Sequence, residues 1–152
     1  MRIETRSLNF DNLLIYETRQ LRKDWQEGFF LMEDFTLAEG IYKNGPTFFS
    51  VAPEKGEDKF GSFTYYLPIS EPVTLADETD FQFQEGFHIE EALVLRQADE
   101  ATDFHAAYAE IKKYAGKNNI SIEDTFYCVL LEVFDEYIID LYVPLKDRGD
   151  AS

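Results

Sequence analysis

Alternating and continuous apolar segments predict four strands in the first half of the chain. Their positions are residues 2–10, 13–16, 47–51 and 60–67. Alternation with a period of two is typical of a strand that is buried on one face. Asp11-Asn12 predicts a turn between the first two segments, and the polar residues 53–59 predict a hairpin connection between the last two.

One helix is predicted between these two pairs of strands. Its apolar positions lie three or four residues apart and therefore share one helical face: Trp25, Phe29, Met32 and Phe35. Asp24 can cap the N-terminus by accepting a backbone N–H bond. The breaker Asn44-Gly45-Pro46 predicts the end of the helix. Gly28 weakens the first turns by about 1 kcal/mol of helix propensity.

The second half of the chain repeats the first. Thr47-Phe48-Phe49-Ser50-Val51 returns as Thr125-Phe126-Tyr127-Cys128-Val129, and Phe63-Thr64-Tyr65-Tyr66-Leu67-Pro68-Ile69 returns as Ile139-Asp140-Leu141-Tyr142-Val143-Pro144-Leu145. Counterparts are 79 positions apart at residues 14 and 93, and 76 positions apart at residues 63 and 139. The spacing shrinks in one direction, as small loop deletions would cause.

The second copy therefore has the same predicted elements. Strands are expected around 81–83, 92–95, 125–132 and 137–145, with a tight turn at 134–136. The second helix is expected to begin with Asp103 as its cap and to end at Asn118-Asn119. Its predicted apolar face consists of Phe104, Tyr108, Ile111 and Tyr114.

These elements predict an α+β fold. Each copy reads strand, helix, strand, strand, with room for an extra strand in front. We therefore expect a tandem duplication of a β-α-β-β unit, with an antiparallel sheet of pseudo-two-fold symmetry and a helix from each repeat. The whole chain of 152 residues is expected to form one domain. Its expected parts are repeat 1 at about 2–70, a linker at 70–80, repeat 2 at about 81–146 and a frayed tail at 147–152. A pocket is expected between the two copies.

Composition narrows the classes of partner. Fourteen basic and thirty acidic side chains give a net charge of −16, which repels nucleic acid and anionic membranes. No apolar run approaches the roughly 20 residues of a membrane span. Cys128 is the only cysteine, so a reducing, cytoplasmic location is expected, and its apolar strand predicts a buried, inert thiol.

No motif in the sequence predicts a cofactor, a metal or a catalytic set. His88 and His105 are the only histidines, and neither has a partner at metal-ligand spacing. Glycine-rich phosphate loops and nucleophile elbows are absent from the sequence. The aromatic share, at 16%, is instead the chain's distinctive chemical resource, because rings can line a binding surface as well as a core.

Asp140 is the residue whose position asks for an explanation. Alternation places Ile139, Leu141 and Val143 on one face of its strand, and Ile138, Asp140 and Tyr142 on the other. The carboxylate either faces water or lies in a lined cavity, where it must be paired, hydrogen-bonded or protonated. In the second case it can attract a cation, with the Tyr142 and Tyr66 rings as walls that each add about 0.5–2 kcal/mol.

The layout and the closing strand resemble those of the GyrI-like family, the effector-binding domains of bacterial transcription activators, which have a SOUL-type fold. That family commonly ends in a strand of the form Thr-Glu-Ile-x-Ile-Pro-Val, and residues 139–145 are similar to it. The resemblance implies a small organic ligand, often cationic and aromatic, in a cleft between the repeats. It also implies that Asp140 takes the place of the family's glutamate.

This sequence departs from the family's pattern in several ways. Aspartate is one methylene shorter than glutamate, and the counterpart of Asp140 in the first copy is the uncharged Thr64. The DNA-binding segment of many relatives is absent, which predicts a stand-alone module. Trp25 and Tyr108 complete the candidate ligand-binding set. Trp25 lies at a helix start, which beside a cleft suits a lid, although core packing is the commoner role of such a ring. Tyr108 is the counterpart of Phe29, and core packing is the alternative for it as well.

Three functions remain open at this level. The favoured one is a module that binds a small amphipathic or cationic organic ligand. The second is an adaptor, chaperone or immunity-type module that uses its acidic loops to bind a basic protein, without a small ligand. The third is a small-molecule hydrolase that uses Asp140 as a base with Tyr142 or Tyr66 as its partner.

Overall fold

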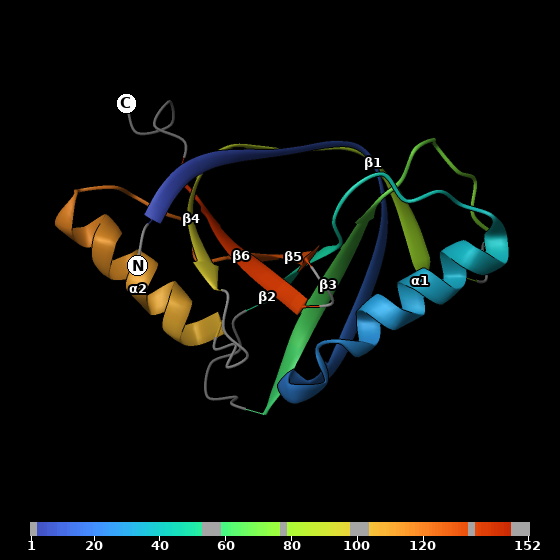
Figure 1. Cartoon of the computed structure of the whole chain (residues 1–152), viewed down its shortest axis with the longest axis horizontal. Helices are drawn as coiled ribbons and strands as arrows, with labels where there is room; N and C mark the ends of the chain where they lie inside the picture. Colours follow the sequence, from blue (N-terminus) through green and yellow to red (C-terminus); the bar gives the residue numbers. More distant parts are fainter. Residues whose placement is uncertain (1–2, 53–58, 77–78, 98–103, 134–135, 147–152) are drawn as a thin grey trace. The chain divides into compact units, whose positions relative to one another are not determined.

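The computed structural model describes residues 3–52, 59–76, 79–97, 104–133 and 136–146. Within them the chain forms six β-strands, two α-helices and one short 3-10 helix (Figure 1). In chain order the elements are β1 (Ile3–Leu21), the 3-10 helix (Arg22–Asp24), α1 (Glu27–Glu39), β2 (Phe48–Ala52), β3 (Phe60–Pro68), β4 (Phe81–Gln97), α2 (Phe104–Lys117), β5 (Tyr127–Val133) and β6 (Glu136–Pro144).

The chain divides into two compact units. The first unit is Asn9–His88, and the second unit combines the residues up to Leu8 with those from Ile89 onward. The two long strands, β1 and β4, therefore each contribute one segment to each unit. The linker expected at 70–80 lies inside the first unit, together with the opening segment of the second repeat.

The first unit is a three-stranded antiparallel arrangement in the order β1-β3-β2 with α1 beside it (Figure 1). Tyr65 on β3 pairs with Tyr16 on β1 and with Phe49 on β2. The rings of Tyr65 and Phe49 contact Phe29 of α1, with centroids 5.4 and 5.7 Å away. The helix therefore covers the face of the strands that carries Tyr65 and Phe49.

Gly28 allows α1 to approach β3 closely. A Cβ atom at this position would lie 2.3 Å from carbons of the Tyr65 ring, far inside van der Waals contact. The Tyr65 hydroxyl donates a hydrogen bond to the carbonyl oxygen of Trp25 at 2.5 Å and accepts one from Gln20 Nε2 at 2.7 Å, so the ring is held in place. The missing side chain is therefore a packing requirement.

The second unit has the same arrangement in the order β4-β6-β5, with α2 packed on β6. Leu141 on β6 pairs with Leu95 on β4 and with Cys128 on β5. These side chains are buried, together with Ile111 of α2. The sequence-based prediction of an α+β fold, with a β-α-β-β unit in tandem and one helix in each repeat, is confirmed.

Three local predictions in the first repeat were wrong. Asp11-Asn12 does not form a turn, because β1 continues through it: the Asn12 carbonyl accepts a bond from the backbone N–H of Ile69, and Leu13 already pairs with Pro68. The helix ends at Glu39 and not near Asn44, because Gly40 adopts φ 68° and the Ile41 N–H closes the last turn on the Thr36 carbonyl. Asp24 is not its cap, since the N-cap residue is Gln26.

The second helix was predicted in the right place but with a partly wrong face. Its buried side chains are Ala107, Ile111 and Ala115, at steps of four, whereas Tyr114 is exposed. Small alanines let the helix lie close to β6, and Tyr114 lies outside the buried row that they form with Ile111. The end at Asn118-Asn119 is confirmed, with Asn119 at φ 55°. The predicted Asp103 cap, most of the 53–59 hairpin connection, the tight turn after β5 and the tail lie outside the described residues.

Candidate functional site

Four of the predicted site residues lie on strands, and the strand register shows which face of the sheet each of them occupies. Residues opposite each other in an antiparallel pair share a face. Asp140 and Tyr142 on β6 share theirs with Arg96 and Val94 on β4, and with Val129 and Tyr127 on β5. Leu141 and Cys128 occupy the other face, as does Phe126, which contacts Tyr108 of α2. Asp140 and Tyr142 therefore lie on the face opposite α2.

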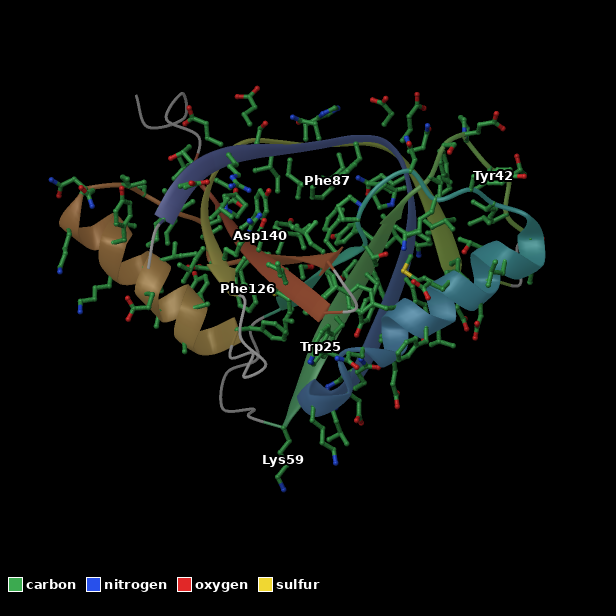
Figure 2. All side chains as sticks on the ribbon, viewed as in Figure 1. Trp25, Tyr42, Lys59, Phe87, Phe126 and Asp140 are labelled. Carbon is green, nitrogen blue, oxygen red and sulfur yellow. The ribbon has the colours of Figure 1, made fainter. Side chains whose placement is uncertain are left out.

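Asp140 is buried and paired. Its side chain is 3% exposed. The residue is labelled in Figure 2. Arg96 donates two hydrogen bonds to it, from Nε to Oδ1 at 2.8 Å and from Nη2 to Oδ2 at 3.0 Å, which is the fork geometry of a bidentate ion pair. Arg6 of β1 adds a longer contact, from Nη1 to Oδ2 at 3.5 Å. A buried carboxylate is costly unless it is paired in this way.

Arg6 extends the pair into a small charge network. It also donates hydrogen bonds to Glu4, from Nε at 3.0 Å and from Nη2. The hydrogen bond to Glu4 is the main reason that the pKa of Arg6 is raised, and a hydrogen bond with the Tyr142 side chain contributes. The hydrogen bonds to Asp140 raise the pKa of Arg96. Two cations and two carboxylates thus meet on this face, with the aspartate at the buried end.

Thr64 and Tyr66 occupy the corresponding face of the first unit, opposite α1. They pair with Ser50 and Phe48 on β2. The Tyr66 ring stacks on Phe48 with centroids 4.7 Å apart and 9° between the planes, and Phe87 of β4 lies 5.3 Å from it. Burial raises the pKa of Tyr66, and a hydrogen bond with Ser50 partly offsets this rise. The face is therefore aromatic at Tyr66 and uncharged at Thr64.

Trp25 and Tyr108 lie on the helix-covered faces of their units, on the other side of the strands from the residues above. Trp25 stacks on Phe49 at 5.6 Å and meets Phe29 edge-on at 5.7 Å. Tyr108 packs against Phe126 at 5.2 Å, and its hydroxyl donates to the Glu123 carbonyl at 3.0 Å. Both rings thus pack between a helix and its strands, while the four strand residues face away from the helices.

Sequence reasoning missed the two arginines. Arg96 lies directly across from Asp140, but 44 positions separate the two residues in the chain, so only the register of β4 against β6 brings them together. A signal was present in the sequence, because Arg96 interrupts the apolar end of β4 as Asp140 interrupts β6. Two opposite charges in neighbouring apolar strands favour a pair.

Other chemistry is scarce in the part of the chain that the structure describes. No cluster of three or more His, Cys, Asp or Glu side chains there could hold a metal ion. Cys128 is buried, as predicted, and burial raises the pKa of its thiol well above the ordinary value. No helix among the described residues is long and apolar enough to cross a membrane. The arrangement can bind and orient charge, through one buried carboxylate and two partly exposed guanidinium groups.

Several solved structures share this fold. The EcmrR C-terminal domain matches with a TM-score of 0.67 at 10% identity, over 97% of this chain and 99% of that one. SAV2435 bound to tetraphenylphosphonium matches with 0.53 at 12% identity, over 99% and 97%. A hydrolase encoded by lin2189 from Listeria innocua matches with 0.63 at 11% identity, over 95% and 92%. In the EcmrR–DNA complex the chain covers 57% of EcmrR.

At these identities the likeness shows the fold. No curated protein sequence matches the chain. A family does match, over residues 10–147 and so over nearly the whole chain. The chain therefore belongs to the family described as Domain of unknown function (DUF5085).

Proposed function

We propose that the protein is a GyrI-like module that binds a small amphipathic organic cation, with Asp140 as the anionic contact and Tyr142 beside it. The observation that carries the proposal is the buried carboxylate on the face opposite α2, in a strand that is otherwise apolar. A carboxylate held out of water interacts far more strongly with a cation than a solvated one does. The net charge of −16 raises the local concentration of cations.

The ion pair with Arg96 defines how such a ligand binds. The Arg96 side chain is about half exposed, so its guanidinium can turn into water at little cost. An incoming cation then takes over the compensation of Asp140 and adds contact with the ring of Tyr142. A large cation with a diffuse charge cannot displace the bidentate Arg96–Asp140 ion pair by charge alone. The apolar groups of the ligand must supply the rest of the binding free energy. The ligand is therefore large and apolar around its charge.

The fold likeness to SAV2435, the protein solved with tetraphenylphosphonium, supports this choice of ligand class. In the first unit, the face with Tyr66 and Thr64 offers aromatic stacking, with Glu17 of β1 opposite Thr64, and we propose it as a second, weaker contact for the ligand's rings. The cleft between the repeats stays a prediction from the sequence. We propose core roles for Trp25 and Tyr108, because both rings pack between helix and strands.

Calorimetric titration of the protein with tetraphenylphosphonium tests the proposal. We expect saturable binding that is weakened about tenfold or more in Asp140→Asn. The matched control is Asp124→Asn, which removes the same charge from an exposed position of the second unit and should leave the affinity unchanged. Tyr66→Leu tests the first-unit face separately.

Circular dichroism shows whether each variant is folded. Equal binding by the parent and a folded Asp140→Asn would remove Asp140 from the site. Absence of binding by the parent to this probe and to a panel of aromatic ammonium ions would overturn the ligand class.

A further inference from the structure

The two helices occupy equivalent positions in the repeats, but their outer surfaces differ. The outer surface of α1 carries three large apolar side chains: Phe30 is 56% exposed, Leu31 47% and Leu37 82%. We call these three residues the outer stripe. Phe30 and Leu37 are seven residues apart, which is two helical turns, so they lie along one line of the helix, and Leu31 lies about 100° around the helix from Phe30. All three side chains of the outer stripe therefore lie on the half of the helix opposite its buried side.

The outer stripe is not the side of α1 that packs on the strands. The side of α1 that faces the strands consists of other residues, Gly28, Phe29, Met32 and Thr36, all of which are buried. An apolar stripe on one side is enough to attach a helix to its domain. A helix that is apolar on both sides is typical of one buried between two neighbours. The outer stripe of α1 has the character of a side that receives a second neighbour.

The helix α2 shows what the same position looks like without such a neighbour. Its buried side consists of Ala107, Ile111 and Ala115, and its exposed positions carry charges, among them Glu110, Lys112, Lys113 and Lys117. Tyr114 is its one exposed large apolar side chain among the described residues. The contrast within one molecule argues that the outer stripe is specific to α1 and is not a general property of the fold.

Charge identifies the kind of neighbour. The sequence of α1 contains four acidic residues, Glu27, Glu33, Asp34 and Glu39, and no basic one. Glu27, Glu33 and Asp34 are exposed and lie within one turn of Phe30 or Leu31, so their carboxylates lie beside and between the side chains of the outer stripe. Lys43 contacts Glu33 at 3.6 Å and compensates one of them. A second copy of this chain would place acid against acid, and its net charge of −16 adds long-range repulsion.

We propose that the outer stripe of α1 is the docking surface for a basic amphipathic helix of a partner protein. The partner's apolar residues, at helical spacing, cover Phe30, Leu31 and Leu37, and its Lys or Arg side chains reach the flanking carboxylates. Burial of exposed aromatic and aliphatic side chains supplies the affinity, and the charges orient the two helices. This surface belongs to the first unit, whereas Asp140 belongs to the second.

The probe is a pair of synthetic 18-residue peptides of identical Leu/Lys composition, one amphipathic as a helix and the other scrambled. Fluorescence anisotropy at physiological salt measures their affinity for the full chain. We expect the amphipathic peptide to bind at least tenfold more tightly than the scrambled one. Leu37→Ser and Phe30→Ser should each weaken it about tenfold, because each removes a large apolar contact without changing the charge. Both positions are exposed, so folding is preserved.

Tyr114→Ser on α2 is the matched control and should leave binding unchanged. Glu33→Gln and Asp34→Asn together should lower the affinity and flatten its salt dependence. Equal binding of the two peptides, or equal binding by Leu37→Ser and the parent, means non-specific charge attraction and overturns the proposal. Concentration-dependent dimerisation that Leu37→Ser abolishes overturns it in favour of self-association.

Discussion

Removing Arg96 should destabilise the fold more than removing the charge of Asp140, although both substitutions break the same ion pair. Asp140 is almost fully buried, whereas the side chain of Arg96 is about half exposed. Arg96→Gln leaves a buried carboxylate whose remaining cation is Arg6 at 3.5 Å. Asp140→Asn leaves a guanidinium that can turn into water. The penalty therefore falls on the variant that retains the buried charge.

The structure sets the scale of the two effects. An unpaired buried charge costs about 3–5 kcal/mol, and the Arg6 contact reduces this, so we expect about 3 kcal/mol for Arg96→Gln. Loss of hydrogen bonds to an exposed arginine costs about 1–2 kcal/mol, which we expect for Asp140→Asn. The double variant should resemble Asp140→Asn, because it contains no buried charge. The two substitutions are thus strongly non-additive.

Urea unfolding followed by circular dichroism, at neutral pH and one fixed salt concentration, measures the free energies of unfolding. Lys113→Gln removes the same positive charge from an exposed position on α2 and should change stability by less than about 0.5 kcal/mol. The reasoning fails if Asp140→Asn proves as destabilising as Arg96→Gln. It also fails if the double variant loses the sum of both single effects.

Four further predictions concern the packing of the units. Gly28→Ala should destabilise the protein by about 1–3 kcal/mol in urea unfolding, because the new Cβ meets the ring of Tyr65, which its hydrogen bonds hold in place. The control Gly116→Ala has open space around it and should be neutral or stabilising by up to about 1 kcal/mol. Equal effects of the two substitutions would contradict the steric argument. Tyr65→Phe should cost about 1–2 kcal/mol, since it removes the hydrogen bonds of the hydroxyl with the Trp25 carbonyl and the Gln20 amide. Burial raises the pKa of Tyr65 above its ordinary value of 10.0, so the stabilising contribution of its neutral hydroxyl is present below about pH 10 and is lost as the pH rises above that value. If the stability of Tyr65→Phe fell as steeply as that of the parent above pH 10, this pH dependence would not come from Tyr65. Cys128 should react with an aromatic disulfide reagent only as fast as the protein unfolds, and a rapid stoichiometric reaction in native buffer would show that the thiol is accessible.

Much of the fold follows from local patterns in the sequence. Alternation identified the strands and placed Asp140 and Tyr142 on one face, opposite Leu141, as the register shows. The repeat then predicted a second unit with the same order of elements. The turn at Asp11-Asn12 was wrong because polar side chains are tolerated where a strand is exposed, and pairing with β3 decides the outcome there. Local turn propensity could not include that pairing.

The candidate site was less accessible to sequence reasoning. A buried aspartate was foreseeable from its apolar neighbours, but its partner was not, because the Arg96 contact depends on the register of two strands far apart in the chain. The exposed side of α1 was also missed. The helical periodicity of the sequence predicted one apolar side, with Trp25, Phe29, Met32 and Phe35. A search for one apolar side does not reveal a second set of apolar residues on the opposite side, which here consists of Phe30, Leu31 and Leu37.

The sharing of β1 and β4 between the two units has a consequence for how the duplicated halves can be handled. Residues up to Leu8 belong with the second unit, and the residues from Phe81 to His88 belong with the first. A polypeptide cut within 70–80 would give two fragments that each lack a native strand segment and retain a foreign one. Such fragments should be insoluble or unfolded alone and should regain structure only when mixed. The ancestral half, before its duplication, would have needed a second copy of itself to supply the same exchange.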